Sequence, residues 1–499
     1  RYRRMRANGS GRGKWWRRRS DVAEPRVAFR GRERIGSFAA LRMTVEGSCL
    51  LFRFVALDRG DHAVGEDDAD FVVGAVAAGG HADAAAAEAV AAEAAAADAE
   101  AELRAAVAVA PHLGAAFHGG AAVDVVRLAQ GHLHHVRGEA EIDLAGADLL
   151  LVDSGELLAW LTGYTVSETL YRAAFLPSDG DAWFCLRALD EAPCRERSWI
   201  TDVVGFDDWQ EPQAAVAASI HDHGFGNARI ALDTNSCSMS ATTFMRLTQL
   251  LPDAHLVPIP DLSDSLRWIK SKAEIEVLRQ AAGIADVAML EIARRAREGM
   301  TTREAAAIAA STFILEGADT GEVGPIVKAA GAHEFLHGVF KTETIMQGDI
   351  LHVELIPRVA NYSARMMRPI MVGAVPAQLT AAAEKIVALQ DQQIAAMKSG
   401  AVARDVDGIM RDGVLSAGLR AHYQNVTAYT LGLYTRTPRS SDFSRVFLPS
   451  ADWMLEDGMV FHVYATAHGL GFSETVVVRP EGGERLTTAT RRILASSFR

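Results

Sequence analysis

Near residue 143 the character of this 499-residue sequence changes, and the change limits where a folded core can form. Arginine and alanine dominate the residues before it, and Lys14 is the sole lysine ahead of Lys270. Residues 79–110 are nearly an alanine tract, with no stripe of large apolar side chains for a helix to bury. We predict that residues 1–142 form a low-complexity extension, disordered or poorly packed. GC-rich DNA read from too early a start would encode a similar segment, so we hypothesise that this extension is not native.

Length and composition define the broad class of the protein. A chain of 499 residues is too long for one ordinary core, so two or three domains are expected. The net charge of −12 argues against nucleic acid as a partner. The four cysteines include no CxxC pair, so neither a disulfide framework nor a thiolate zinc site is indicated and a cytoplasmic location is expected. No run of about 18 apolar residues occurs, so no membrane partner is expected.

Residues 143–265 alternate between strand-like and helix-like segments. The patterns predict strands at 147–153, 173–176, 182–186 and 229–232, a hairpin turn at 178–181, and helices at 212–223 and 241–251. This alternation indicates a mixed α/β domain that ends in the linker 258–261.

Residues 266–499 combine longer helices with separate strands. Apolar residues at three- and four-residue steps predict an amphipathic helix that begins near Ser271 and ends at Gly299. Thr301 and Glu304 form a capping-box pattern at the start of the next helix. Further helices are predicted at 378–398 and 403–416, and strands at 350–356, 369–372, 459–464 and 475–478. The fold class predicted for the chain is therefore α+β.

Several short sequence motifs, which occur in a fixed order, carry a family resemblance. They are residues 267–275 (RWIKSKAEI), 299–304 (GMTTRE), 348–350 (GDI), 456–461 (EDGMVF) and 474–478 (ETVVV). From about residue 143 onward the chain resembles the superfamily of creatinase, aminopeptidase P and prolidase. The resemblance implies a pita-bread catalytic domain at 266–499 and a smaller creatinase-type domain at 143–265.

The metallopeptidases of that superfamily bind two cations through two aspartates, a histidine and two glutamates. The resemblance places Glu354 and Arg365 at the aspartate positions, Tyr429 at the histidine and Tyr464 at the first glutamate. Glu474 matches the last glutamate. An arginine has no lone pair to offer a cation and repels it. We therefore predict a creatinase-like member without the metal ligands, and no cofactor.

The remaining candidate residues follow from the same resemblance. His337 matches the catalytic histidine that moves protons between water and the leaving nitrogen, and His333 is the alternative if the register differs. Glu354 and Glu474 are expected to face the cavity and hold a cationic group. An alternative is that Glu354 only neutralises Arg365 in a buried ion pair.

Other residues are assigned to substrate binding. Tyr429 and Tyr464 are candidate donors to a developing oxyanion, although wall residues of this kind are commonly structural. Arg365, Arg436 and Arg172 are candidates to bind a substrate carboxylate in bidentate fashion. The resemblance also implies a homodimer in which the small domain, with Arg172, covers the active site of the partner.

The leading hypothesis is a metal-independent hydrolase that cleaves a C–N bond in a small zwitterionic amidine, a guanidino acid or an N-acyl amino acid. One alternative is a Xaa-Pro-type metalloaminopeptidase or dipeptidase. Another is a non-catalytic, peptidase-like binding protein. Fold resemblance alone does not choose among them, because function depends on details of the site that vary within a fold.

Overall fold

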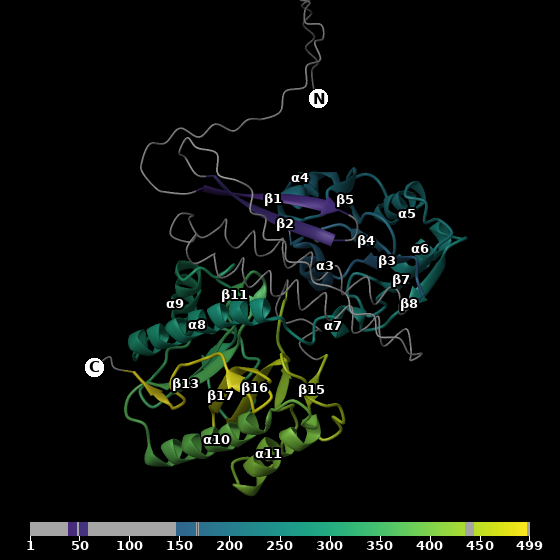
Figure 1. Cartoon of the computed structure of the whole chain (residues 1–499). Helices are drawn as coiled ribbons and strands as arrows, with labels where there is room; N and C mark the ends of the chain where they lie inside the picture. Colours follow the sequence, from purple (N-terminus) through teal and green to yellow (C-terminus); the bar gives the residue numbers. More distant parts are fainter. Residues whose placement is uncertain are drawn as a thin grey trace, which may run out of the picture. The chain divides into compact units, whose positions relative to one another are not determined.

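Two large β-sheets organise the part of the chain that the structure, a computed structural model, describes (Figure 1). The described residues are 38–46, 49–57, 146–165, 167, 169–434 and 444–496. The chain divides into two units, Arg1–Ala82 and Asp83–Arg499. In the first unit, β1 (Phe38–Glu46) and β2 (Cys49–Leu57) pair as an antiparallel hairpin. The rest of the predicted extension, up to residue 142, lies outside the described residues.

The first large sheet has six strands in the order β6-β5-β4-β3-β7-β8. Its strands are β3 (Leu149–Val152), β4 (Ala173–Pro177), β5 (Trp183–Arg187), β6 (Asp202–Phe206), β7 (Arg229–Leu232) and β8 (His255–Pro258). Its helices are α3 (Gly155–Thr162), α4 (Glu191–Arg197), α5 (Pro212–Asp222), α6 (Ala241–Leu250) and α7 (Leu262–Ser265). The mixture of parallel and antiparallel pairs confirms the α/β character predicted for this region.

The second sheet has nine strands, seven of them in the order β15-β14-β16-β17-β13-β10-β9. The strands are β9 (Ile326–Lys328), β10 (Ile350–Leu355), β13 (Met366–Met371), β14 (Ala428–Thr430), β15 (Val446–Phe447), β16 (Val460–Ala467), β17 (Leu470–Val477), β18 (Glu484–Arg485) and β19 (Leu494–Ala495). A separate ribbon joins β11 (Arg358–Val359) to β12 (Tyr362–Ser363). Four helices accompany this sheet: α8 (Lys272–Arg295), α9 (Thr302–Leu315), α10 (Ala377–Ala396) and α11 (Ala403–Ser416).

The first two of these helices begin as their sequences predict. Ser271 and Glu274 form a complete capping box at α8, and Thr301 and Glu304 form another at α9. The predicted end of α8 at Gly299 is wrong, because Ala296 already leaves the helical conformation at φ −59°, ψ 131°. Gly299, at φ 81°, instead forms the turn toward α9.

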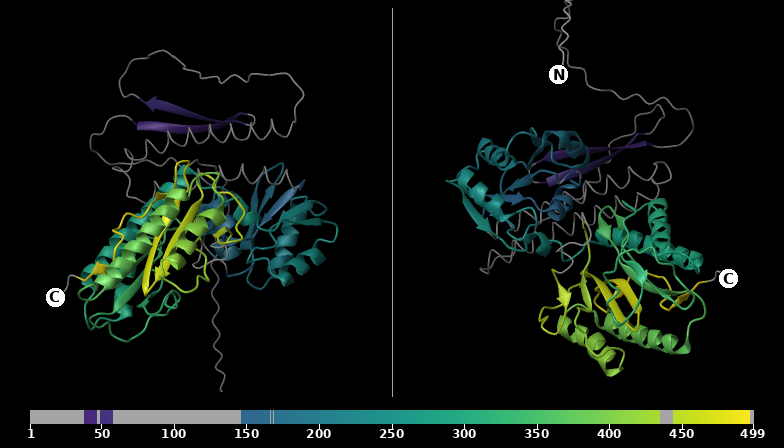
Figure 2. Two further views of the ribbon diagram at one scale, coloured as in Figure 1. Left: turned by 90° about the horizontal axis from the view of Figure 1, so that it is seen from below. Right: turned by 180° about the vertical axis from the view of Figure 1, so that it is seen from behind.

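Alternate residues of the nine-stranded sheet point to opposite faces. On one face Leu351, Val353 and Leu355 of β10 pack with residues of α8 and α9. On the same face Phe461 and Val463 of β16 pack with residues of α10 and α11. Figures 1 and 2 show α10 and α11 side by side, with α10 against strands β16 and β17 and α11 against β15. We call this the helix-covered face. The opposite face, which carries the alternate residues of the same strands, is called the site face.

No helix in the described ranges has both the length and the apolar character needed to cross a membrane.

Candidate active site on the site face

The site face gathers polar side chains from several strands. Glu354 of β10 lies opposite Met367 of β13, which in turn lies opposite Ser473 of β17. Ser473 is paired with Tyr464 of β16, on the same face. Tyr429 of β14 is aligned with His462, two residues before Tyr464 on β16. Residues far apart in the sequence thus share one surface because of strand register.

An arginine occupies the centre of this group. Nη1 of Arg365 donates a hydrogen bond to the Tyr429 hydroxyl over 2.7 Å and lies 3.6 Å from Oε1 of Glu354. Thr475 of β17 fixes the backbone of Arg365, since its Oγ1 accepts from the Arg365 amide at 2.8 Å and donates to the carbonyl at 3.0 Å. Arg365 is therefore held through its backbone by β17 and through its side chain by Tyr429 of β14. The expected ion pair between Glu354 and Arg365 is present.

The hydroxyl of Tyr464 lies on the same face, next to this group. The ring centroid of Tyr464 lies 5.8 Å from that of Tyr429, and the Tyr464 hydroxyl accepts a hydrogen bond from Nδ2 of Asn425 at 3.1 Å. Burial raises the pKa of Tyr464 to about 12, and the Glu354 charge acts in the same direction. The phenol therefore keeps its proton at neutral pH and can act as a donor. Between 4% and 7% of Glu354, Arg365, Tyr429 and Tyr464 remains exposed, whereas the neighbouring Ser473, Thr475 and His462 are at 0%.

Two buried histidines form part of the same face. Neither ring nitrogen of His352 or His462 has a hydrogen-bond partner among the described residues. Burial lowers the pKa of His352 to about 3. The pKa of His462 is lowered well below its ordinary value, first by burial and then by the Arg365 charge. Both rings are therefore neutral at physiological pH, and they add no positive charge beside the guanidinium.

The two histidines of the loop before β10 lie in different surroundings. His337, predicted as the proton carrier, is exposed and makes no hydrogen bond or ion pair with another described residue. Nδ1 of His333 lies 3.2 Å from Nη2 of Arg420, which also belongs to a hydrogen-bond network leading to Tyr464. Between the two histidines, Leu336 packs against Tyr429 and Tyr464. The structure thus connects His333 to the site face and leaves His337 at the surface of the same loop.

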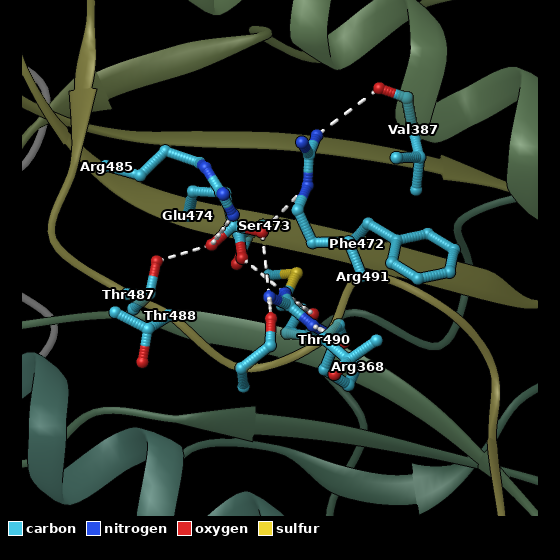
Figure 3. A network of polar contacts seen from close by, with 12 residues as sticks. Arg368, Val387, Phe472, Ser473, Glu474, Arg485, Thr487, Thr488, Thr490 and Arg491 are labelled. Carbon is cyan, nitrogen blue, oxygen red and sulfur yellow. Dashed lines mark hydrogen bonds and ion pairs between the residues drawn. The ribbon is translucent and has the colours of Figure 1, made fainter.

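The prediction that Glu474 faces the cavity is wrong. Glu474 lies opposite Val463, on the helix-covered face, one residue out of phase with Tyr464. Its Oε1 accepts a hydrogen bond from Nη2 of Arg368 at 2.8 Å (Figure 3), and both side chains are completely buried. The position next to Tyr464 on the site face belongs to Ser473. The sequence itself indicates that Glu474 points to the helix-covered face, because it alternates with the apolar residues Phe472 and Val476.

Further groups surround Glu474 on that face. Thr487 donates a hydrogen bond to Oε2 of Glu474 (Figure 3). Nε of Arg491 lies 3.2 Å from Oε1, which is close enough for charge attraction, but the two groups are not aligned as a hydrogen bond. Arg485 approaches Oε2 at 4.0 Å. This second network is separate from the site and joins β17 to the segment that follows β18.

Two of the predicted carboxylate-binding arginines do not join the site. Arg172 is 4% exposed, and its Nη1 donates to the Asp153 carbonyl at 2.9 Å and to Oγ of Ser238 at 3.1 Å, within the small domain. It therefore contributes a contact to its own domain, and the expectation that it reaches into another subunit gains no support. Arg436 lies outside the described residues. Arg365 is the one of the three that the described strands bring to Glu354.

Two protein-family models match consecutive parts of this chain. Residues 138–269 match the model of the Creatinase/Prolidase N-terminal domain, and residues 276–480 match that of Metallopeptidase family M24. The chain belongs to the creatinase and prolidase superfamily. It is a hydrolase of that superfamily, whose members act on C–N bonds, and both the pita-bread fold and the creatinase-type domain are confirmed.

Relatives within the superfamily have different substrates. The chain is 26% identical over 242 residues to a Xaa-Pro dipeptidase of Pyrococcus furiosus, covering 47% of this chain and 68% of the relative. It is 22% identical over 399 residues to the ectoine hydrolase of Halomonas elongata, covering 73% and 96%. A solved Xaa-Pro dipeptidase from Bacillus anthracis superposes with a TM-score of 0.63 at 20% identity, covering 73% of this chain and 99% of the other. At this identity the superposition establishes the fold alone.

The residues present do not fit the metal centre that the M24 family implies. Arg365 places a positive charge 3.6 Å from Glu354, where a cation would compete with it. The hydroxyl of Tyr429 accepts from the same guanidinium. Among the described residues, no three His, Cys, Asp or Glu side chains gather in a group able to hold a metal ion. The donors at the site suit hydrogen bonding and proton transfer instead.

Sequence reasoning missed Arg420. It precedes β14 in a connecting segment and matches no motif of the family, so no spacing rule singles it out. Its burial, at 5% exposed, and its contact with His333 arise only when distant segments meet.

Proposed function

We propose that this protein is a metal-independent hydrolase that cleaves a C–N bond in a small, carboxylate-bearing molecule. The candidate substrates are a zwitterionic amidine, a guanidino acid or an N-acyl amino acid. The observation that carries the proposal is the Arg365 guanidinium, which lies 2.7 Å from the Tyr429 hydroxyl and 3.6 Å from Glu354. A positive charge fixed at this point supplies electrostatic stabilisation without a metal ion.

Three kinds of group take part in the proposed reaction. The carboxylate of Glu354 accepts a proton as water attacks the carbon of the C–N bond. Arg365 and the hydroxyls of Tyr429 and Tyr464 stabilise the negative charge that develops on the substrate oxygen, or the equivalent nitrogen of an amidine. A histidine of the loop 333–337 delivers a proton to the leaving nitrogen from its imidazolium form, and the proton taken up by Glu354 restores that form at the end of the cycle. The new C–O bond replaces the broken C–N bond, and the amine leaves protonated.

The two loop histidines are distinguishable candidates for the last role. Because an arginine can only donate, Nδ1 of His333 accepts from Arg420, which leaves Nε2 as the ring nitrogen able to exchange a proton with a substrate. His337 matches the family position but has no contact that would orient it. We retain His337 as the proposed proton carrier and treat His333 as the competing one, to be separated by substitution.

A screen with chelator-treated protein tests the proposal. Small amidines, guanidino acids, N-acyl amino acids and Xaa-Pro dipeptides are offered, and released amine is measured. We expect amine release from one of the first three classes, unaffected by chelation. Retention of about two equivalents of manganese, zinc or cobalt, together with Xaa-Pro cleavage that is lost on chelation, would instead establish the metallopeptidase alternative.

The binding-protein alternative predicts a different outcome. It predicts that the protein binds one of these molecules and releases no amine, and that His337→Ala leaves binding intact. Glu354 and the Tyr429 hydroxyl both lie within 3.6 Å of the Arg365 guanidinium, and the Tyr464 ring lies beside that of Tyr429, which supports catalysis over binding alone.

The proposed setting is the cytoplasm, and the proposed assembly is a homodimer, in line with the behaviour expected for the superfamily. Because Arg172 is buried in its own domain, the site proposed here does not depend on that residue. Sedimentation equilibrium of the purified protein measures the assembly. A monomer at micromolar concentration would remove the dimer from the proposal and leave the chemistry unchanged.

A further inference from the structure

Asn425 lies in the segment that joins α11 to β14, beside the candidate active site. Its Oδ1 accepts a hydrogen bond from Nη1 of Arg420 at 3.0 Å. Its Nδ2 donates to the Val426 carbonyl at 3.0 Å and to the Tyr464 hydroxyl at 3.1 Å. A side-chain amide has two N–H hydrogens, so both hydrogens of this one are engaged. Asn425 therefore has a partner at each polar atom of its side chain.

Two of these partners decide which way the Asn425 amide faces. A guanidinium can only donate and a backbone carbonyl can only accept, so the amide oxygen must face Arg420 and the amide nitrogen must face Val426. A rotated amide would place two donors against each other at Arg420 and two acceptors against each other at Val426. The donor role of Asn425 toward Tyr464 is therefore imposed by the surrounding network and does not depend on the tyrosine.

Arg420 is a fixed anchor for this arrangement. Each of its four Nη hydrogens has an acceptor, and these acceptors belong to Asn425, Thr466, Gln424 and His333. The backbone of Asn425 is held as well, because its carbonyl accepts from Nη2 of Arg411 at 3.1 Å. Both the side chain and the backbone of Asn425 are therefore fixed by arginines.

The orientation of Asn425 determines where the Tyr464 hydrogen points. A phenol hydroxyl has a single hydrogen, so an N–H donor on one side of the oxygen leaves that hydrogen directed to the other side. No acceptor for this hydrogen lies within hydrogen-bond distance among the described residues. Burial and, to a smaller extent, the Glu354 charge raise the pKa of this phenol, so the hydroxyl lies near the proposed base. The Tyr464 hydrogen is thus available to a molecule bound at the site.

A hydrogen directed into the site distinguishes among the candidate substrates. The carbonyl oxygen of an N-acyl group accepts it, and the oxyanion formed as water attacks accepts it more strongly. A protonated amidine or guanidine carries a positive charge and N–H donors on its nitrogens, so it would meet the Tyr464 hydrogen donor to donor. Glu354, which could attract such a cation, already lies 3.6 Å from Nη1 of Arg365.

We propose that Asn425 is a positioning residue that turns the Tyr464 hydrogen toward the substrate, so that the site binds a neutral N-acyl group in preference to a protonated amidine or guanidine. This inference rests on the proposed function for its location, but its tests require no turnover. It narrows the three candidate substrate classes to one. Asn425 acts through Tyr464 and does not itself touch the substrate.

Two ligands that share a glycine moiety test the preference. N-acetylglycine carries a neutral acyl group where guanidinoacetate carries a guanidinium, and each is titrated by calorimetry into the full-length protein. We expect the wild type to prefer N-acetylglycine by roughly tenfold, equivalent to about 1.4 kcal/mol. Tyr464→Phe should remove most of this preference, because the donor is lost. Asn425→Asp should remove it too, since the new carboxylate keeps the contact with Arg420 and itself accepts the Tyr464 hydrogen.

A double-variant cycle separates the role of the hydrogen from that of the added charge. The carboxylate in Asn425→Asp also attracts a cation directly, and this effect should be the same whether or not the Tyr464 hydroxyl is present. In the Tyr464→Phe background we therefore expect Asn425→Asp to change the preference by less than about threefold. An equal change in both backgrounds would overturn the proposal, because charge alone would then explain it. Asn227→Asp adds the same charge at an exposed turn of the small domain and should leave the preference unchanged.

The hydroxyl itself is observed by NMR of protein isotopically labelled at the tyrosine Cζ carbon, with the Tyr464 signal assigned by its loss in Tyr464→Phe. A phenol that donates to a carboxylate gains negative charge on its oxygen, so the signal should shift toward the tyrosinate position in Asn425→Asp; an unchanged signal would contradict the proposed orientation. Thermal unfolding of Asn425→Asp should not fall below that of the wild type, since Arg420 gains a charged acceptor. Asn425→Ala, which leaves the hydroxyl free to rotate, should also weaken the preference, and an undiminished preference there would count against the role.

The outcome is independent of the proposed reaction. If the ligand preference depends on Asn425 and Tyr464 while no substrate class releases amine, the positioning role stands and the hydrolase proposal fails. If amine is released from amidines or guanidino acids and not from N-acyl compounds, the hydrolase stands and the role of Asn425 is refuted. Binding of neither ligand by the wild type, or tighter binding of guanidinoacetate, refutes that role as well.

Discussion

Glu474 distinguishes two accounts of this molecule, because the family resemblance assigns it to catalysis and the structure assigns it to a buried ion network (Figure 3). If the structure is right, Glu474→Gln should destabilise the protein and leave the affinity for substrate unchanged. The substitution keeps an acceptor for Arg368 and Thr487 but removes the negative charge. The affected cations are Arg368, which is completely buried, and Arg491, whose Nε lies 3.2 Å from the carboxylate.

The size of the effect follows from the partners that remain. Arg368 also donates to the carbonyls of Met367, Ser473, Thr490 and Ala489, at distances between 2.8 and 3.1 Å. Its hydrogen bonds therefore survive, and the loss is mainly that of charge compensation. Breaking one side of a buried pair costs about 3–5 kcal/mol, and the retained acceptor places Glu474→Gln near the lower value. For a domain of this size that corresponds to a fall of about 6–12 °C in the unfolding midpoint.

Thermal unfolding followed by circular dichroism measures the change, with Glu276→Gln as the control. Glu276 is 61% exposed, and its replacement should shift the midpoint by no more than about 1 °C. Combining Glu474→Leu with Arg368→Met should cost less than the two single changes together, since neither member of the completely buried pair is then left without its partner. A Glu474→Gln protein that unfolds like the wild type but has lost turnover by orders of magnitude would refute the assignment.

Three further predictions concern the site face. Glu354→Gln should lower turnover by about two to four orders of magnitude, since the amide cannot accept the proton of water; unchanged turnover of the best substrate would exclude it as the base. His337→Ala should cause a loss of similar size if that residue carries the proton, and His333→Ala the same if the histidine bound to Arg420 does; whichever variant keeps full activity in the amine-release assay is eliminated. Burial lowers the pKa of His352 to about 3 in the folded protein. Below about pH 6.5 this histidine is therefore protonated in the unfolded chain while it stays neutral in the folded one. Stability should therefore be constant above that pH and fall by about 2 kcal/mol between pH 7 and 5 through this residue, a dependence that His352→Leu should remove from urea titrations.

Local patterns of the sequence predicted most of the elements. The strand at 229–232 and the helices beginning near Ser271 and Thr301 were located because apolar periodicity, capping residues and turn residues act over a few positions. The end of α8 was misplaced, because the chain leaves the helix at Ala296 before it reaches the glycine that forms the following turn. Boundaries of this kind depend on the neighbouring packing.

The site was predicted less completely, for a different reason. Glu354, Arg365, Tyr429 and Tyr464 were identified from motif positions, and register brings them to one face. Glu474 was misassigned by one residue, and one residue is enough to move a strand side chain to the opposite face. Arg420 depends on contacts between segments separated by as many as 87 positions, which no local pattern encodes.

The network behind β17 also has a consequence for biosynthesis. Asp286 of α8 accepts hydrogen bonds from the backbone of Thr488 and Ala489, and β13 pairs in parallel with β19. Arg368 cannot be neutralised until Glu474 has left the ribosome, and the segment that closes over it follows later still. Helix α8 must therefore wait for residues far downstream, since 203 positions separate Asp286 from Ala489. Strand β13 waits for nearer ones, since 106 positions separate Arg368 from Glu474. Folding of this domain is consequently late and slow compared with that of the smaller one, and a nascent chain stalled before residue 474 would expose a strand and a cation that invite chaperone binding.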